Sequence, residues 1–583
     1  MDKVIELSGP PSVSWRRVLR IRHPWATLLL LFLILLTMAP LLTLIFGSFS
    51  NSTEIGEFKD FGLQNYARAY LRKTTLVILG NTLILTAGSV FLGVSLALSL
   101  AWLVERTNIP CKGILYAAIP LTLAIPGVLH AISWILLFSP RMGYVNRWMM
   151  TTFGLSTAPF NTYTLHGMIV LEALRVVPTA FLLMVPLLRN MDTSLEEAAA
   201  VSGAAPFSRL RRITLPVVSS GIIAVLIYET ITVLETFEIP GILGLPARIY
   251  VFSTKIYAVT QGLETPDYGQ ANALAMAYML MAAVGVLLYA RATRRAEKFA
   301  VITGRGYRPK LLDLGWWRYA AAGVAGLYLT LTLVLPLLVL FWTSLLPYPA
   351  MPSEKSLALV SLDNYRTIAI YGATWKVLKN TALMVAATAV GTIVLSFFIS
   401  WIIVRTRFWG RGLLDMLAFL PRSIPGIVKA LALMWIFLVL RPYFPIYGTV
   451  WLISLGFILS FIAYGTRSIT ASLLQIHREL EEAAYLSGAT LPVTFWRIHF
   501  PLLVPAFVGL AIWSMFLSIR LTGLPLMLYE GAENQVLSVF IWMMWDDGQM
   551  GAVSGLGVLT LLFLFLVAVV MRRMGFREVG AHR

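Results

Sequence analysis

Two stretches of the sequence decide the fold, because one repeats the other: EEAAAVSGAAPFSRLRRITLP at residues 196–216 and EEAAYLSGATLPVTFWRIHFP at residues 481–501. In both copies a Glu-Ala-Ala tripeptide is followed after three residues by a glycine, and later by a proline. The alanine-rich start predicts a helix with small side chains. The glycine predicts the end of this helix, and the proline predicts the first turn of the next helix. A repeat with unchanged spacing indicates a duplicated chain.

The duplication extends well beyond these two stretches. Motifs nearer the N-terminus recur 299 residues later, whereas the Glu-Glu-Ala-Ala and Ser-Gly-Ala motifs recur 285 residues later. The difference of 14 residues predicts an insertion in the first copy, in the loop around 139–163. The pairs at the longer offset are Asn65-Tyr66 with Asn364-Tyr365, Asn81-Thr82 with Asn380-Thr381, Arg106-Thr107 with Arg405-Thr406, and Ile125-Pro126-Gly127 with Ile424-Pro425-Gly426.

The composition indicates an integral membrane protein. Hydrophobic residues make up 58% of the 583 residues and charged residues 13%, about half the charged share of a soluble domain. Apolar runs such as Trp25–Phe46 and Leu556–Met571 are long enough to cross, or nearly cross, a hydrocarbon core of about 30 Å. The net charge of +18 lies mainly in short segments between apolar runs. We therefore attribute it to membrane topology rather than to nucleic-acid binding.

Hydropathy predicts twelve transmembrane spans. Basic residues precede the first span, fill the segment after the sixth and follow the last, so alternation of the spans puts both termini on the cytoplasmic side. The loop 523–552 on the opposite side holds no Lys or Arg. The predicted spans are 25–46, 77–104, 114–138, 164–187, 214–237, 272–291, 318–345, 379–404, 413–440, 446–465, 500–522 and 553–571.

These spans divide into two repeats of six. An even number of spans makes the second copy enter the membrane from the same side as the first, so the copies run parallel about an axis along the membrane normal. The sequence predicts an all-α polytopic membrane protein with about 12 transmembrane helices in two pseudo-symmetric repeats. The predicted parts are a cytoplasmic N-terminal segment 1–24, a first repeat 25–291, a basic cytoplasmic linker 292–317, a second repeat 318–572 and a cytoplasmic tail 573–583.

The repeated stretches resemble a family signature. The inner-membrane components of binding-protein-dependent ABC importers of the type I fold carry E-A-A, three residues, G, nine residues, I-x-L-P. The first copy matches at every position, and the second departs only by Phe500 in place of Leu. The resemblance covers residues 60 to 570 as two tandem copies and implies that each loop forms a coupling helix docked on a cytosolic ATPase. The residues that would carry this role are Glu197, Ala198, Ala199 and Gly203, and Glu482, Ala483, Ala484 and Gly488.

The resemblance also implies partners and a location. These are two copies of a cytosolic ABC ATPase, a periplasmic substrate-binding protein and membrane lipid, in a bacterial inner membrane. The chain has no G-x-x-x-x-G-K-[ST] motif, no H-E-x-x-H motif and one cysteine, Cys111. We therefore expect no catalysis, no cofactor and no metal on this chain, with ATP and Mg²⁺ on the partner. A membrane-embedded enzyme is the alternative from another class, and a passive channel would not need two matched docking helices.

Ionisable residues inside the spans are candidates for the translocation path, because an unpaired charge in lipid is costly. The candidates are His130, Glu235, Arg422, Lys429 and Arg520. By the repeat offsets Glu235 aligns with Arg520, and His130 aligns with Lys429. Contacts between the halves that close a gate, the lining of a hydrophilic passage and structural ion pairs all remain open at this point.

Two prolines and two acidic neighbours belong to the same region. Pro126 and Pro425 each precede a glycine and predict breaks in the third and ninth spans, either at a cavity or as packing kinks. Glu229 and Glu238 lie close to Glu235 in the sequence.

The cargo follows from analogy alone. Fused permeases of this length most resemble the ferric-iron type, and relatives of that type handle thiamine, polyamines or phosphonates. No cluster of Tyr, Asp or Glu in the sequence resembles an iron-binding site.

Overall fold

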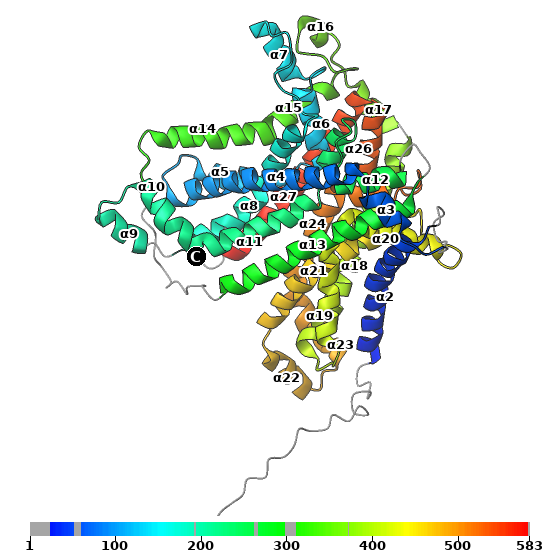
Figure 1. Cartoon of the computed structure of the whole chain (residues 1–583). Coiled ribbons are helices and arrows are strands. Elements are labelled where there is room, and N and C mark those ends of the chain that lie inside the picture. Colours follow the sequence, from blue (N-terminus) through cyan, green and yellow to red (C-terminus); the bar gives the residue numbers. More distant parts are fainter. Residues whose placement is uncertain are drawn as a thin grey trace, which may run out of the picture.

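The computed structural model describes residues 24–51, 60–189, 191, 194–261, 266–297, 311–370 and 372–580. Most of the predicted N-terminal segment 1–24, much of the linker 292–317 and the end of the tail 573–583 lie outside these residues. The described chain is built from helices, with two isolated β-bridges and no strand among the described residues. Figure 1 shows the helices of both halves.

The helices of the first half follow the predicted spans, with short helices between them. They are α2 (Pro24–Phe49), α3 (Gln64–Tyr70), α4 (Lys73–Arg106), α5 (Lys112–Leu121), α6 (Gly127–Phe138), α7 (Tyr144–Phe153), α8 (Leu165–Arg189), α9 (Ser194–Val201), α10 (Pro206–Arg209), α11 (Leu215–Leu234), α12 (Phe252–Gln261) and α13 (Tyr268–Glu297).

The second half repeats this order. Its helices are α14 (Trp317–Leu329), α15 (Leu335–Ser344), α16 (Glu354–Leu357), α17 (Asp363–Ile370), α18 (Gly372–Arg405), α19 (Arg411–Phe419), α20 (Gly426–Val439), α21 (Val450–Gln475), α22 (Arg478–Leu486), α23 (Leu491–Thr494), α24 (Phe500–Arg520), α25 (Gly523–Met527), α26 (Leu537–Asp546) and α27 (Met550–Gly580).

The number of membrane helices agrees with the sequence prediction. Ten described helices are long and apolar enough to cross a membrane, and there are twelve if each of two bent pairs counts as one span. The all-α polytopic fold is thereby confirmed. Several helices extend past their predicted ends: α4 runs from Lys73 to Arg106, where hydropathy predicted 77–104. Hydropathy misses such ends because polar residues continue a helix after the apolar run stops.

The two bent pairs lie at the prolines singled out in the sequence. The axis turns by 98° between the segments Lys112–Ala124 and Gly127–Phe138, and by 109° between Arg411–Ser423 and Gly426–Val439. In each pair the residue before proline is extended, with φ −81° and ψ 117° at Ile125 and φ −104° and ψ 120° at Ile424. A proline disfavours the helical conformation of the residue before it, which explains both breaks.

The first membrane helix of each half lies against the other half. Ala26, Leu30 and Leu33 of α2 are buried in one apolar cluster with residues of α18, α19 and α21, and Figure 1 shows α2 beside this second-half bundle. In return α14 runs beside α5, and Tyr328 Oη lies 3.1 Å from Thr122 Oγ1. The halves are therefore held together by an exchange of helices as well as by their facing surfaces.

The end of the linker is attached to the first half. Leu312 N donates to Arg106 O at 2.9 Å, and Asn108 N donates to Leu312 O at 3.0 Å. Asn108 Nδ2 also donates to Asp313 Oδ1 at 2.5 Å. These bonds bring the chain back to the end of α4, and α14 starts from there toward α5.

The predicted insertion coincides with a helix that has no counterpart. In the first half the segment between α6 and α8 contains α7, whereas the equivalent segment 440–449 between α20 and α21 contains no helix. The shorter repeat offset beyond this point follows from that difference.

Candidate functional site

The two repeated stretches form the same helix–turn–helix unit. α9 and α22 each end at a glycine with positive φ, +82° at Gly203 and +79° at Gly488. Ala204 N donates to Ala199 O at 2.9 Å and Ala489 N donates to Ala484 O at 3.0 Å, which closes a Schellman-type end on each helix. A Cβ at either glycine would meet no atom within 4 Å, so backbone conformation, not space, requires glycine here.

A π-helical turn follows each unit before the next membrane helix. The turns are Leu210–Thr214 and Phe495–His499, and Pro216 and Pro501 then stand in the first turns of α11 and α24. Single π turns within helices occur often at functional sites. The duplication is thus retained in the details of the backbone.

The predicted coupling residues lie mostly at the surface of these units. Ala198 and Gly203 of the first unit and Glu482, Ala483 and Gly488 of the second are exposed. Glu197, Ala199 and Ala484 are half-buried. None of the described side chains of α9 and none of those of α22 is buried. Both short helices therefore present a small-residue surface to whatever lies outside the chain.

The preceding glutamate of each unit, which the sequence did not single out, faces inward. Arg106 Nη1 lies 3.8 Å from Glu196 Oε2, and Thr214 Oγ1 donates to Glu196 Oε1. Arg106 Nη2 also donates to Leu188 O at 2.7 Å and to Met191 O at 3.4 Å, at the end of α8.

The second half repeats this cluster with a closer ion pair. Arg405 Nε lies 2.8 Å from Glu481 Oε1, and Arg405 Nη2 donates to Leu473 O at 3.0 Å and to Ile476 O at 2.8 Å. His499 Nε2 lies 3.0 Å from Glu481 Oε1, where the first half has Thr214. The repeated Arg-Thr pair at 106 and 405 was the sequence signal for these arginines, although it did not reveal their role.

Two predicted path residues from opposite halves form an ion pair. Arg422 Nη1 lies 3.0 Å from Glu235 Oε1, and both side chains are largely buried. Lys429, which is buried, donates to Pro421 O at 3.3 Å. Glu235 does not pair with its repeat equivalent Arg520, because equivalent residues lie on opposite sides of a two-fold axis unless both lie at the axis.

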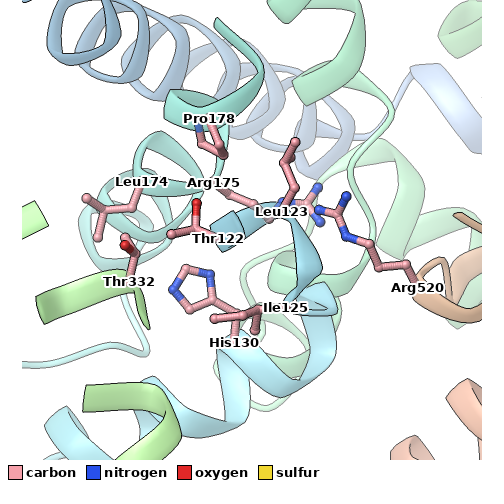
Figure 2. A pocket seen from close by; sticks show the side chains of 9 residues that line it. All are labelled: Thr122, Leu123, Ile125, His130, Leu174, Arg175, Pro178, Thr332 and Arg520. Carbon is pink, nitrogen blue, oxygen red and sulfur yellow. The ribbon is translucent and has the colours of Figure 1, made fainter. Parts of the chain in front are cut away.

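The other two predicted path residues line one small cavity, also from opposite halves. His130 of α6 and Arg520 of α24 border a space of about 10 Å³, close to the room that one water molecule needs. Figure 2 shows Arg520 extending toward Arg175 of α8, with the His130 ring beside Thr122. His130 is buried, and its Nε2 has no hydrogen-bond partner within the described parts of the chain.

A buried polar network lies beside this cavity, and the candidates from the sequence include only part of it. Arg175 Nη2 lies 3.1 Å from Glu172 Oε1, and Arg175 Nη1 lies 3.5 Å from Glu238 Oε2. Thr522 N, from the second half, donates to Glu238 Oε1 at 3.2 Å. The sequence points to Glu238 as a neighbour of Glu235, but the predicted path residues include neither Glu172 nor Arg175. Both are ionisable residues within a predicted span, so the rule that found the other candidates could have found them.

Most of the charges in this region are divided between the halves, although the first half also supplies one cation, Arg175, which pairs with Glu172 and Glu238. All four buried or largely buried carboxylates belong to the first half: Glu172, Glu229, Glu235 and Glu238. The second half contributes three cations instead: Arg422, Lys429 and Arg520. Glu235 and Arg422 therefore attract each other across the interface, and separating them would leave unpaired charges at low dielectric.

Aromatic side chains close the same interface next to the ion pairs. Phe237 stacks on Trp542 of the second half with ring centroids 5.5 Å apart, and both side chains are buried. A Cβ on Gly241 would lie 2.5 Å from Trp542 Cη2, so the indole lies directly on the backbone of the first half.

Metal ligands are not gathered in the described chain. No group of three or more His, Cys, Asp or Glu residues that could hold a metal ion occurs among the residues that the structure describes.

The repeated helix–turn–helix units and the six-span halves agree with a family of known proteins. The family of binding-protein-dependent transport system inner membrane components matches residues 89–298 and again residues 392–578, together more than half of the chain. The chain belongs to this family. It is the permease of an ABC importer, and the tandem match confirms the resemblance inferred from the repeated signature.

Individual relatives cover different shares of the chain. A ferric transport system permease of Actinobacillus pleuropneumoniae is 25% identical over 74% of this chain, which spans 61% of that relative's length. An Fe(3+)-transport system permease of Haemophilus influenzae is 20% identical over 95% of this chain and 99% of its own length. A sulfate transport system permease of Escherichia coli is 30% identical over 35% of this chain and 83% of its own length.

Proposed function

We propose that this importer permease forms the complete translocation path, with two cytosolic ATPase subunits docked on its two coupling units. The observation that carries the proposal is the geometric identity of those units. α9 and α22 have the same glycine-terminated ends and the same π turns, and their outer residues are exposed. Two equal docking surfaces suit two copies of one ATPase subunit, because symmetric assemblies present the same patch twice.

The membrane orientation in this proposal follows from the basic segments. The coupling units, the linker and both termini lie on the cytoplasmic side of a bacterial inner membrane, and the loop 523–552 lies on the periplasmic side. ATP and Mg²⁺ bind to the partner ATPase, and this chain holds no cofactor. A periplasmic binding protein delivers the cargo on the opposite side, as the family's description implies.

The interface between the halves acts as the gate of the path. Its closed form is held by the Glu235–Arg422 pair, by the Glu238 network and by the stacked Phe237 and Trp542. Opening requires these contacts to separate, which the ATPase drives through the coupling units. The separated charges then line a hydrophilic passage and attract solutes that carry polar or charged groups.

Ferric iron is the cargo that we propose, on the strength of the ferric permeases among the relatives. A polyamine, thiamine or a phosphonate is the alternative within the same transporter class, and the sulfate permease among the relatives adds sulfate to that range. In this proposal the binding protein selects the cargo and the path conducts it.

Co-purification tests the docking assignment. We expect Glu197→Lys and Glu482→Lys together to abolish capture of the ATPase subunit that co-purifies with the wild-type chain, and to abolish uptake of ⁵⁵Fe by cells. Glu354→Lys reverses the charge of an exposed residue of α16, outside both coupling units, so it serves as a matched control that retains capture. Full capture and uptake in the double variant would refute the coupling assignment.

The cargo is tested separately from the docking. Uptake of ⁵⁵Fe, radiolabelled sulfate, thiamine and putrescine is compared in cells with and without the chain. Loss of only one of these activities identifies the cargo. A membrane-embedded enzyme, the competing class, would instead turn over a lipid-linked substrate without any ATPase partner.

A further inference from the structure

We propose that Arg106 and Arg405 are positioning residues that fix the two coupling helices to the membrane core, each through the first glutamate of its Glu-Glu-Ala-Ala motif. The inference rests on the proposed docking function of α9 and α22 and adds a mechanism for it. The arginines do not touch the partner in this scheme. They transmit the movement of the docked ATPase to α4, α8, α18 and α21.

The coupling helices lack an apolar attachment to the bundle. No residue of α22 is buried, and the same holds for the described side chains of α9. A helix of this length is marginal alone in water and depends on tertiary contacts for its position. The attachment must therefore come from the flanking loops and from polar contacts.

Arg405 provides the polar contact in the second half. Its guanidinium group belongs to the last turn of α18, donates to the carbonyls of Leu473 and Ile476 at the end of α21, and pairs with Glu481 in the first turn of α22. Carbonyls at a helix end lack partners within the helix and carry partial negative charge. One cation thus joins three elements at a point where two of them end and the third begins.

The arginine side chain is suited to this task. Its planar group offers five N–H donors in fixed directions, so it can bind carbonyls and a carboxylate at once. The Arg405 side chain is only 6% exposed and that of Arg106 only 7%. Because water is largely excluded, the ion pairs are screened little and hold their geometry.

The first half supplies a second instance, in which the arginine–glutamate distance is longer, 3.8 Å against 2.8 Å. Arg106 makes the corresponding contacts to Leu188 O, Met191 O and Glu196. The remaining neighbour of the glutamate changes from Thr214 to His499, although both occupy the π turn before the next membrane helix. The Arg–Glu contact is thus common to the halves while its neighbour differs. The features that both halves share are the bonds from the arginine to the carbonyls and its pair with the glutamate.

The test uses the full chain in lipid nanodiscs together with the ATPase subunit that co-purifies with it. We expect Arg405→Ala to raise amide hydrogen exchange across 478–486 at least ten-fold and to leave the centres of α18 and α21 unchanged. ATPase capture persists, whereas import of ⁵⁵Fe per ATP hydrolysed, measured with the same proteins in sealed proteoliposomes supplied with the binding protein, falls at least ten-fold. Glu481→Gln raises amide exchange across 478–486 and lowers import by smaller factors. Arg106→Ala raises amide exchange across 194–201 instead.

Matched variants separate positioning from general stability. Arg407→Ala removes an exposed arginine two residues from Arg405, and Glu354→Gln removes an exposed carboxylate of α16, outside both coupling units. Both variants behave as wild type. Unchanged exchange in α22 together with unchanged import per ATP would overturn the inference. So would a rise in exchange throughout α18 and α21, which would assign the cluster to the fold alone. If the wild-type chain captured no ATPase subunit, that result would instead refute the proposed docking.

Discussion

Arg422 of the second half lies 3.0 Å from Glu235 of the first half, and this ion pair bridges the interface between the two repeats. The Arg422 side chain is 31% exposed and that of Glu235 is 20% exposed. The pair is therefore screened less than a surface pair, although water still reaches it. Removing one partner leaves a charge with poor solvation, at an expected cost of about 1–3 kcal/mol to the closed arrangement.

We predict that Arg422→Ala loosens the closed interface. A change of about 1.4 kcal/mol raises the open fraction roughly ten-fold, so basal ATP hydrolysis by the assembled transporter should rise without added cargo. The double variant Glu235→Arg with Arg422→Glu restores an attractive pair and should return hydrolysis toward the wild-type rate. Arg441→Ala removes an exposed pair with Glu530 and serves as control. Equal rates in all four proteins would show that the pair does not hold the gate.

Gly203 and Gly488 should tolerate alanine poorly. Each has positive φ and open space around the position of a Cβ, so the cost is conformational, about 1 kcal/mol per site. The helix ends of α9 and α22 should fray and ATPase affinity should fall several-fold, measured by titrating the ATPase onto nanodiscs. Asparagine adopts positive φ more readily than alanine, so the asparagine variants should bind more tightly. Tighter binding by the alanine variants would contradict this account of the turns.

The contact between α4 and α8 depends on a small residue at Gly93. A Cβ there would lie 2.6 Å from Ala173 O and 2.7 Å from Val176 Cβ, and the backbone oxygen cannot move away without shifting α8. We expect Gly93→Ala to destabilise the protein by about 1–3 kcal/mol, seen as a lower midpoint of thermal unfolding in detergent.

Gly80 of the same helix is the matched control for that change. A Cβ there meets nothing within 4 Å, so Gly80→Ala should be neutral or stabilising by up to about 1 kcal/mol. A lower midpoint for the Gly80 variant than for the Gly93 variant would mean that the helix contact is not the cause.

The attachment of the linker to α4 should weaken in acid. The Gly315 N–H and the Asn108 side-chain amide donate to Asp313, which lowers the pKa of this carboxyl group below its usual value. A carboxylate with a lowered folded pKa stabilises its surroundings above the unfolded pKa of about 3.9 and loses that effect as the pH falls through the folded pKa. Amide exchange at 311–315, corrected for its intrinsic pH dependence, should rise in that range. Asp313→Ala should show the rise at neutral pH, and pH-independent protection in both proteins would refute this role.

The sequence by itself determined the class of the fold and the position of the two repeated helix–turn–helix units. Spans of this length and hydropathy must be helical, because the membrane interior offers no other partner for backbone groups. The repeated Glu-Ala-Ala and glycine pattern also specified where the short helices lie and how they end, since helix propensity and positive φ are local properties. The breaks at Pro126 and Pro425 followed for the same reason, from the geometry of a single residue.

Only the tertiary structure decided which charged residues meet. The repeat offsets aligned Glu235 with Arg520, yet Glu235 lies against Arg422 and Arg520 lies beside the cavity of His130. The tertiary structure also brings Arg106 against Glu196, ninety residues further along the chain. It packs the first helix of each half against the other half. Alignment compares equivalent positions, whereas an interface between two halves brings together positions that are not equivalent. Their pairing depends on the packing of whole helices, which no local pattern records.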